Sequence, residues 1–225
     1  MKKIKKLPFR WQTQFIFKSL LAGVLIALAG GTYLSCGSII TDPNLHKIVG
    51  SFLFSIGLIA VLLLDANLFT GKVGYIDSWP KFGLACTALV YNLLVAFFIG
   101  FLYRGIHGVP VGGGPFGPES LRATNNWVMT LFNGFGCGVL IYLAVELYRR
   151  TKSIVPVIIC VMAFILSGTE HCIADAFYLG ASHLSWIAVG KLGLIIIGNS
   201  LGSVSVHWLL KGAEYLNELP DNIQR

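Results

Sequence analysis

Charged residues are scarce in this chain. Only 12% of its 225 residues are Asp, Glu, Lys or Arg, whereas 55% are hydrophobic, and the mean hydropathy is +0.74. A soluble domain normally carries about 25% charged residues. The chain has too little polar surface to cover a globule in water, so we expect lipid to cover much of it.

Motifs of several other protein classes are also missing. The five cysteines include no Cys-x-x-Cys pair and the histidines share no metal-ligand spacing, so we predict neither a disulfide framework nor a metal or cofactor site. The net charge of +7 falls in short basic clusters between apolar runs, which argues against a nucleic acid partner and indicates membrane topology. Residues 1–14 precede an apolar run with no small-residue cleavage site, so we interpret them as a basic cytoplasmic tail.

Long apolar runs fill most of the remaining chain. A helix needs roughly 20 apolar residues to cross the hydrocarbon of a bilayer. The runs predict an all-α membrane protein with six transmembrane helices over residues 15–210, followed by a second cytoplasmic tail at 211–225. The expected spans are 15–36, 49–66, 82–103, 124–147, 153–179 and 185–210.

Lysine and arginine indicate the orientation of these spans. Cytoplasmic loops carry an excess of both residue types. One set of segments between the spans holds twelve of them, and the other holds only Lys47, Arg104 and Arg122. Because an even number of spans places both termini with the larger set, we expect cytoplasmic termini in a plasma (inner) membrane.

Residues 105–121 divide the chain into two halves, 15–104 and 122–210. This segment holds six glycines and three prolines, so we expect an external loop. Asn92 in the third span and Asn199 in the sixth occupy similar places, which suggests an inverted repeat of the kind found in transporters and channels. The plainer interpretation of these asparagines is two interhelical hydrogen bonds, each worth about 1 kcal/mol.

Polar residues interrupt the second span at its end. The apolar run 52–64 meets Asp65, Asn67 and Thr70, yet the apolar pair Leu68-Phe69 lies among them. A helix that ended at the membrane surface would give a similar pattern. Apolar side chains on a turn-rich segment favour a loop folded back into the protein, because irregular backbone at membrane depth must be buried or line a cavity.

The fifth span is interrupted by Glu170 and His171, which have apolar residues on both sides. Ionisable groups inside a span are costly and are functional by default. Glu170 fits two roles equally well, in the pore or as a cap for backbone amides that the break leaves open. His171 is the stronger pore candidate, because an imidazole exchanges protons near neutral pH.

The residues around these breaks form two motifs in a fixed order. They are Phe54-Ser55-Ile56-Gly57-Leu58 with Leu68-Phe69-Thr70-Gly71, then Phe164 with Gly168-Thr169-Glu170-His171-Cys172-Ile173-Ala174, joined by Gly198-Asn199 and Gly202 in the sixth span. In this order and separation they resemble the formate/nitrite transporter family over residues 15–210. The resemblance implies an aquaporin-like fold with the second and fifth helices broken, assembled as a homopentamer.

The resemblance also implies a function. Each protomer would pass small monovalent anions or their protonated acids, such as formate, nitrite, hydrosulfide or lactate, together with protons. Thr70 and His171 would face each other in the pore, and Arg122 matches the family's basic vestibule residue. The constrictions would be Phe54 and Phe164 on the outer side and Leu58 and Leu68 on the cytoplasmic side.

Two positions depart from the family pattern. Asn67 stands where an acidic residue is usual, and Asp175 stands where an asparagine is usual. The two changes together resemble an exchange of a carboxylate and an amide. We therefore hypothesise that these side chains approach each other across the breaks.

Other functions fit the sequence less well. A neutral-solute channel of aquaporin-like fold is the main alternative, but it would need two Asn-Pro-Ala motifs that this chain lacks. A membrane-embedded enzyme would need a nucleophile placed on a base, and Ser167 is too close to His171 on a broken segment, so we expect no enzyme. A structural or sensory protein gives no reason for the two breaks. Which anion passes, and whether His171 donates a proton or stays charged, both remain open.

Overall fold

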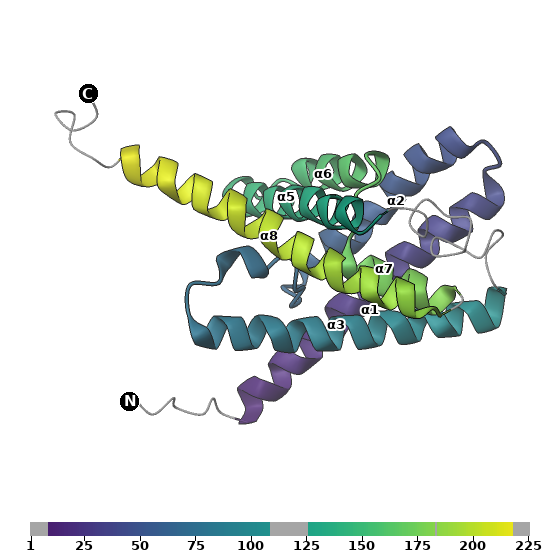
Figure 1. Cartoon of the computed structure of the whole chain (residues 1–225), viewed down its shortest axis with the longest axis horizontal. Helices are drawn as coiled ribbons and strands as arrows, with labels where there is room; N and C mark the ends of the chain where they lie inside the picture. The colour runs from purple at the N-terminus through teal and green to yellow at the C-terminus, as the bar shows by residue number, and fades with distance from the viewer. Residues whose placement is uncertain (1–8, 109–125, 183, 218–225) are drawn as a thin grey trace.

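The computed structural model describes residues 9–108, 126–182 and 184–217, and every regular element in them is a helix (Figure 1). The helices pack side by side, and the start of α1 and the end of α8 lie at the same end of the bundle. The elements are α1 (Phe9–Ile39), α2 (Pro43–Leu63), the short 3-10 helix η1 (Val73–Tyr75), α3 (Trp79–His107), α5 (Trp127–Thr151), α6 (Val155–Leu166), α7 (Cys172–Ala181) and α8 (Trp186–Asn217).

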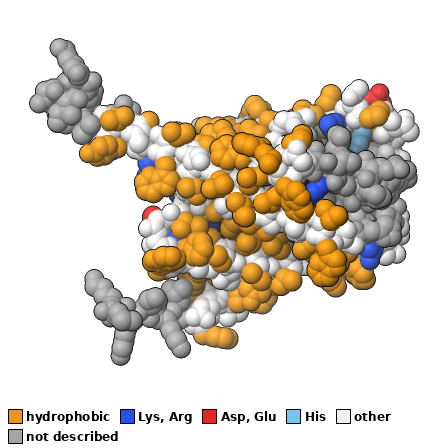
Figure 2. Space-filling view, in the orientation of Figure 1, with side chains coloured by type: hydrophobic (Ala, Val, Ile, Leu, Met, Phe, Trp, Pro, Cys, Tyr) orange, Lys and Arg blue, Asp and Glu red, His pale blue; other side chains and the backbone are white. Residues whose placement is uncertain are grey.

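Within the described residues, five helices are long and apolar enough to cross a membrane: α1, α2, α3, α5 and α8. The expected fifth span, 153–179, is instead divided into α6 with 12 residues and α7 with 10. Several helices extend beyond the expected spans, and α1 already begins at Phe9 inside the expected tail. Large apolar side chains cover much of the outside (Figure 2), as expected for a protein surrounded by lipid.

Small residues allow the helices to pack closely. Gly138 of α5 and Gly202 of α8 each face the backbone of the other helix, at Asn199 and Phe135 respectively, with no room for a Cβ atom. Such small-residue contacts are typical of helix pairs in membranes, where apolar burial alone does not favour association. The pairs α5–α8, α3–α7, α1–α3 and α1–α2 form the main contacts of the bundle.

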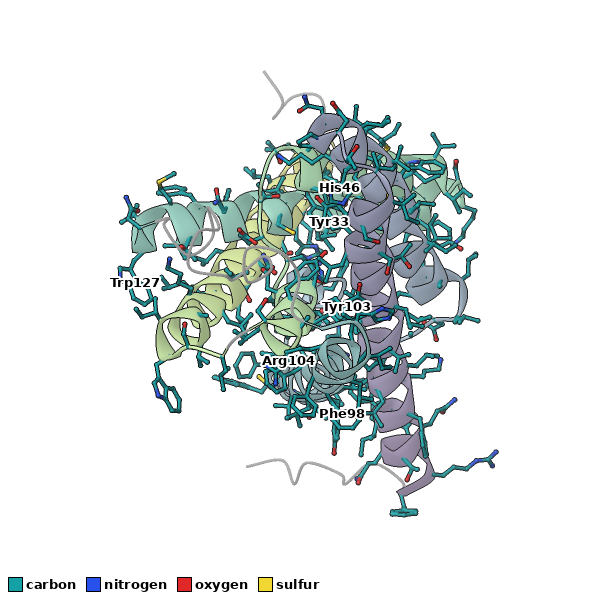
Figure 3. The ribbon with its side chains drawn as sticks, turned by 90° about the vertical axis from the view of Figure 1, so that its right-hand side faces the viewer. Tyr33, His46, Phe98, Tyr103, Arg104 and Trp127 are labelled. Atoms are coloured by element: carbon teal, nitrogen blue, oxygen red, sulfur yellow. The ribbon has the colours of Figure 1, made fainter. Side chains whose placement is uncertain are left out.

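Polar contacts join the helices at the end of the bundle viewed in Figure 3. The rings of Tyr33 in α1 and His46 in α2 lie 4.7 Å apart, and His46 Nε2 is 3.0 Å from the Tyr33 carbonyl oxygen. Arg104 Nη1, near the end of α3, donates to the Ser182 carbonyl oxygen at 2.8 Å. These contacts hold the last turn of α7 against α3 and the start of α2 against α1.

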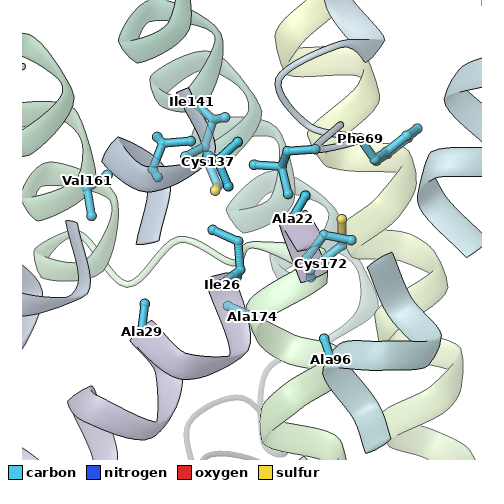
Figure 4. Packing of buried hydrophobic residues seen from close by; sticks show 14 of the residues in the cluster. Ala22, Ile26, Ala29, Phe69, Ala96, Cys137, Ile141, Val161, Cys172 and Ala174 are labelled. Carbon is cyan, nitrogen blue, oxygen red and sulfur yellow. The ribbon is translucent and has the colours of Figure 1, made fainter. Parts of the chain in front are cut away.

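The buried core surrounds the short helix α7 and the segment that follows α2. Figure 4 shows Ile26, Phe69, Cys172 and Ala174 among the packed side chains. All ten residues of α7 are buried. The centre of the bundle is therefore built around the two segments where the sequence predicted interruptions.

Candidate functional site

The segment after α2 is a loop folded into the protein. Asp65 has a left-handed backbone with φ of +49°, which turns the chain at the end of the helix. Leu68 and Thr70 are 1% exposed and Asn67 is 5% exposed. The prediction of a buried loop, and not a helix end at the membrane surface, is confirmed.

The break between α6 and α7 is also buried. Gly168 has φ of +74°, a conformation that favours glycine, and the Thr169 amide donates to the Phe164 carbonyl oxygen. His171 is the N-cap of α7 and is 2% exposed, and Glu170 is 3% exposed. The predicted interruption of the fifth span is confirmed.

The side chain of Asn92 binds the loop after α2. Its Oδ1 accepts from the Phe69 amide at 2.9 Å, and its Nδ2 donates to the Ser19 and Asn67 carbonyl oxygens at 2.6 and 3.1 Å. Asn92 is fully buried. One amide therefore joins α3, α1 and the loop.

Asn199 repeats this pattern at the second break. Its Oδ1 accepts from the Cys172 amide at 2.9 Å, and its Nδ2 donates to the Gly134 and Glu170 carbonyl oxygens, both at 2.8 Å. The prediction that these asparagines make interhelical hydrogen bonds is confirmed. Because Asn199 and His171 bond amides at the start of α7, that terminus does not depend on Glu170 for them.

Thr70 and His171 meet at the centre. Thr70 Oγ1 lies 2.9 Å from His171 Nε2, and both residues are buried. His171 Nδ1 accepts from the Ala174 amide at 3.2 Å, which leaves Nδ1 without a proton. In a neutral imidazole the proton is then on Nε2, so His171 donates to the Thr70 hydroxyl oxygen.

Two aromatic side chains lie on one side of this contact. The rings of Phe54 and Phe164 are 5.9 Å apart in an edge-to-face arrangement, and the rings of Phe164 and His171 are 6.0 Å apart. Both phenylalanines are buried. The sequence-predicted outer pair is thus brought together next to His171.

A cavity of about 670 Å³ lies at the end of the bundle where α1 begins. Leu58 and Leu68 line it, and each is 1% exposed. Phe54 and Leu58 lie one turn apart on α2, so the leucines are nearer this cavity than the phenylalanines are. The cavity therefore leads from the surface to the leucine pair.

Cationic side chains surround this cavity, and the sequence analysis did not single them out. Lys18, Lys72 and Arg149 line it together with one acidic residue, Asp65. Lys18 Nζ lies 2.5 Å from Asp65 Oδ2. Burial lowers the pKa of Lys72, and the nearby Asp65 carboxylate opposes this shift. Sequence gave only a weak signal, because Lys18 lies inside an apolar run, 47 residues from its partner.

A second cavity, of about 400 Å³, lies beside the first. Tyr75 Oη donates to Glu146 Oε2 at 2.6 Å, and the Arg149 guanidinium lies 4.5 Å from the centre of the Tyr75 ring. Tyr142 Oη is 2.9 Å from His207 Nδ1. These contacts fix η1 against α5 and hold the loop after α2 in place.

Two of the predicted sites are not brought together. Asn67 Nδ2 donates to the Phe15 carbonyl oxygen at 3.1 Å, so this amide faces α1. Asp175 is fully buried in the first turn of α7. Their approach to each other stays a prediction. Arg122 lies outside the described residues.

The chain is similar to known transporters along most of its length. The family model described as formate/nitrite transporter matches residues 1–213. The nitrite transporter NirC of Escherichia coli is 28% identical over 219 residues, which covers 90% of this chain and 80% of the relative. The formate channel FocA of Haemophilus influenzae is 26% identical over 180 residues, covering 70% and 62% respectively.

Solved structures share the fold. An ion channel of the FNT family superposes with a TM-score of 0.74 at 24% identity, covering 93% of this chain and 91% of that one. A pentameric formate channel with formate bound superposes with a TM-score of 0.61 at 18% identity, covering 92% and 95%. The family match spans nearly the whole sequence, so this integral membrane protein belongs to the formate/nitrite transporter family.

Proposed function

We propose that the protein is a channel that passes small monovalent anions, or their protonated acids, through a pore in each protomer. Formate, nitrite, hydrosulfide and lactate represent this substrate class. The observation that carries the proposal is the buried hydrogen bond between Thr70 and His171, which lies next to the phenylalanine pair. The cation-lined cavity that ends at Leu58 and Leu68 supports it.

The proposed architecture has six spans, with α6 and α7 together forming a broken fifth span. The matching hydrogen bonds of Asn92 and Asn199 support an inverted repeat of the two halves. The formate channel of similar fold is pentameric, which supports a homopentamer here. We place the protein in the plasma (inner) membrane with both termini cytoplasmic, so the cation-lined cavity opens to the cytoplasm.

Anions meet opposing effects along such a pore. The cations around the cavity raise the local concentration of anions at its mouth. An apolar constriction then strongly disfavours a bare anion, because a charge loses its hydration there. Burial favours the protonated form of a weak acid, so passage past the leucines and phenylalanines is easiest as a neutral acid.

The hydrogen bonds of His171 support a neutral imidazole in the pore. Protonation at Nδ1 would break its bond with the Ala174 amide and place a cation at the positive end of α7. We therefore propose that Nε2–H donates a hydrogen bond to the passing oxygen or sulfur atom in exchange for Thr70. The transported proton then comes from the solvent and not from His171.

Purified protein in liposomes tests this function. Formate and nitrite should enter faster than into protein-free vesicles, whereas glycerol should enter at the same rate as in protein-free vesicles. Protein-dependent entry of glycerol without entry of any of the anions would contradict the proposal and would favour a neutral-solute channel.

A further inference from the structure

Lys191 is a buried cation that the proposed pathway does not yet use. It lies in α8, five residues after the first residue Trp186, and is 4% exposed. Removing an ammonium group from water costs several kcal/mol unless an opposite charge compensates it. A buried lysine in this part of the helix therefore needs a carboxylate nearby.

Glu170 is that carboxylate. It is 3% exposed, and an electrostatic interaction joins it to Lys191. The geometry agrees, because Asn199 holds the Glu170 carbonyl oxygen at 2.8 Å from the same helix. Lys191, Ile195 and Asn199 recur every four residues and therefore share one face of α8.

The other half of the chain lacks both charges. Asn92 corresponds to Asn199, and the carbonyl oxygen that accepts from Asn92 belongs to Asn67 instead of Glu170. The residue eight positions before Asn92, which corresponds to Lys191, is Leu84. A carboxylate and an ammonium thus occur together in one half, and an amide and an apolar side chain occur together in the other.

This correspondence also indicates where the charged pair lies. Asn67 and Leu84 both line the 670 Å³ cavity on the leucine side of the Thr70–His171 contact. In an inverted repeat, their counterparts Glu170 and Lys191 occupy the equivalent place on the phenylalanine side. The pair would therefore face the opposite entrance of the pore.

We propose that Lys191 is a positioning residue that compensates the Glu170 carboxylate, so that an anion which approaches His171 from the external side meets no net negative charge. The inference rests on the proposed anion channel. Without the ammonium, the carboxylate would repel an anion at short range in surroundings where water screens little. Lys191 thereby contributes to the selectivity of the pore without contacting the transported ion.

Formate uptake into liposomes by the full-length protein tests the pairing. Lys191→Met, which keeps a long side chain but removes the charge, should lower uptake about tenfold. Lys191→Arg should keep it close to that of the unsubstituted protein. Glu170→Gln combined with Lys191→Met should restore most of the uptake, because the double variant has neither charge. Lys211→Met, which removes an exposed ammonium from the same helix, is the matched control.

Each outcome decides the matter. Uptake by Lys191→Met equal to that of the unsubstituted protein would overturn the inference, as would a double variant no better than the single one. If Lys191→Met fails to assemble, the double variant should assemble, since it buries no uncompensated carboxylate, and its failure would count against the pairing. The proposed function fails separately, if the unsubstituted protein takes up no anion.

Discussion

At the scale of single residues, the two bonds of His171 determine what its imidazole can do. Nδ1 is occupied by the Ala174 amide and Nε2 faces the Thr70 hydroxyl. A side chain held at both nitrogens has one tautomer and one orientation. His171 can therefore present an N–H to the pathway without changing its charge.

Thr70→Val removes the acceptor opposite this N–H and keeps the shape of the side chain. We expect formate flux in liposomes to fall about tenfold, because loss of a buried hydrogen-bonding partner costs about 1–3 kcal/mol. Thr70→Ser keeps a hydroxyl and should retain most of the flux. Equal flux through the valine and serine variants would show that the hydroxyl has no role in permeation.

Asn92→Leu should mainly affect stability. The variant leaves the Phe69 amide and the Ser19 and Asn67 carbonyl oxygens without their partner. We expect a loss of about 3 kcal/mol, since each bond contributes about 1 kcal/mol. Thermal unfolding in detergent measures it. Asn92→Asp can still accept but cannot donate, so its stability should lie between the two.

At the scale of the elements, the sequence already predicted most of the helices. The apolar runs place five of the expected spans on α1, α2, α3, α5 and α8. Glu170 and His171 mark the break in the fifth, because ionisable groups inside an apolar run need a buried irregular backbone. Local patterns suffice for these features, since each depends on residues close together in the chain.

Contacts between distant segments could not be predicted in the same way. The Lys18–Asp65 ion pair joins residues in two different helical regions, and Lys18 lies within a run that hydropathy assigns to lipid. The left-handed backbone of Asp65 is likewise a property of the folded loop. The cation-lined cavity therefore became apparent only in three dimensions.

Gly202→Ala tests the packing of α5 against α8. A Cβ atom at this position would collide with the Phe135 carbonyl oxygen, so we expect the helices to separate and the stability to fall by about 1–3 kcal/mol. Gly193→Ala is the matched control on the same helix, because a Cβ atom there meets no heavy atom within 4 Å. Its thermal stability should stay equal or rise slightly. A Gly202→Ala protein as stable as the control would contradict the close packing.

At the scale of the whole molecule, the uneven distribution of charge shapes the pathway. Lys18, Lys72 and Arg149 surround one entrance, whereas Leu58 and Leu68 close its inner end. The arrangement combines electrostatic attraction with a barrier to bare charge. Such a pore concentrates anions at its mouth and then selects the forms that can lose their hydration.

Lys72→Met should lower anion flux at low ionic strength more than at high ionic strength. Salt screens attraction to a cationic mouth over about 10 Å at 0.1 M, so the contribution of the lysine should shrink as salt rises. Formate efflux from liposomes at two salt concentrations measures this. A loss of flux independent of salt would indicate a steric role for Lys72 instead.

Proton-coupled formate entry tests the account most directly. Liposomes that contain the purified protein and a pH-sensitive dye are given external formate, with and without an inward proton gradient. We predict protein-dependent formate uptake that acidifies the interior and accelerates with the gradient. Formate uptake no faster than in protein-free vesicles would contradict the account.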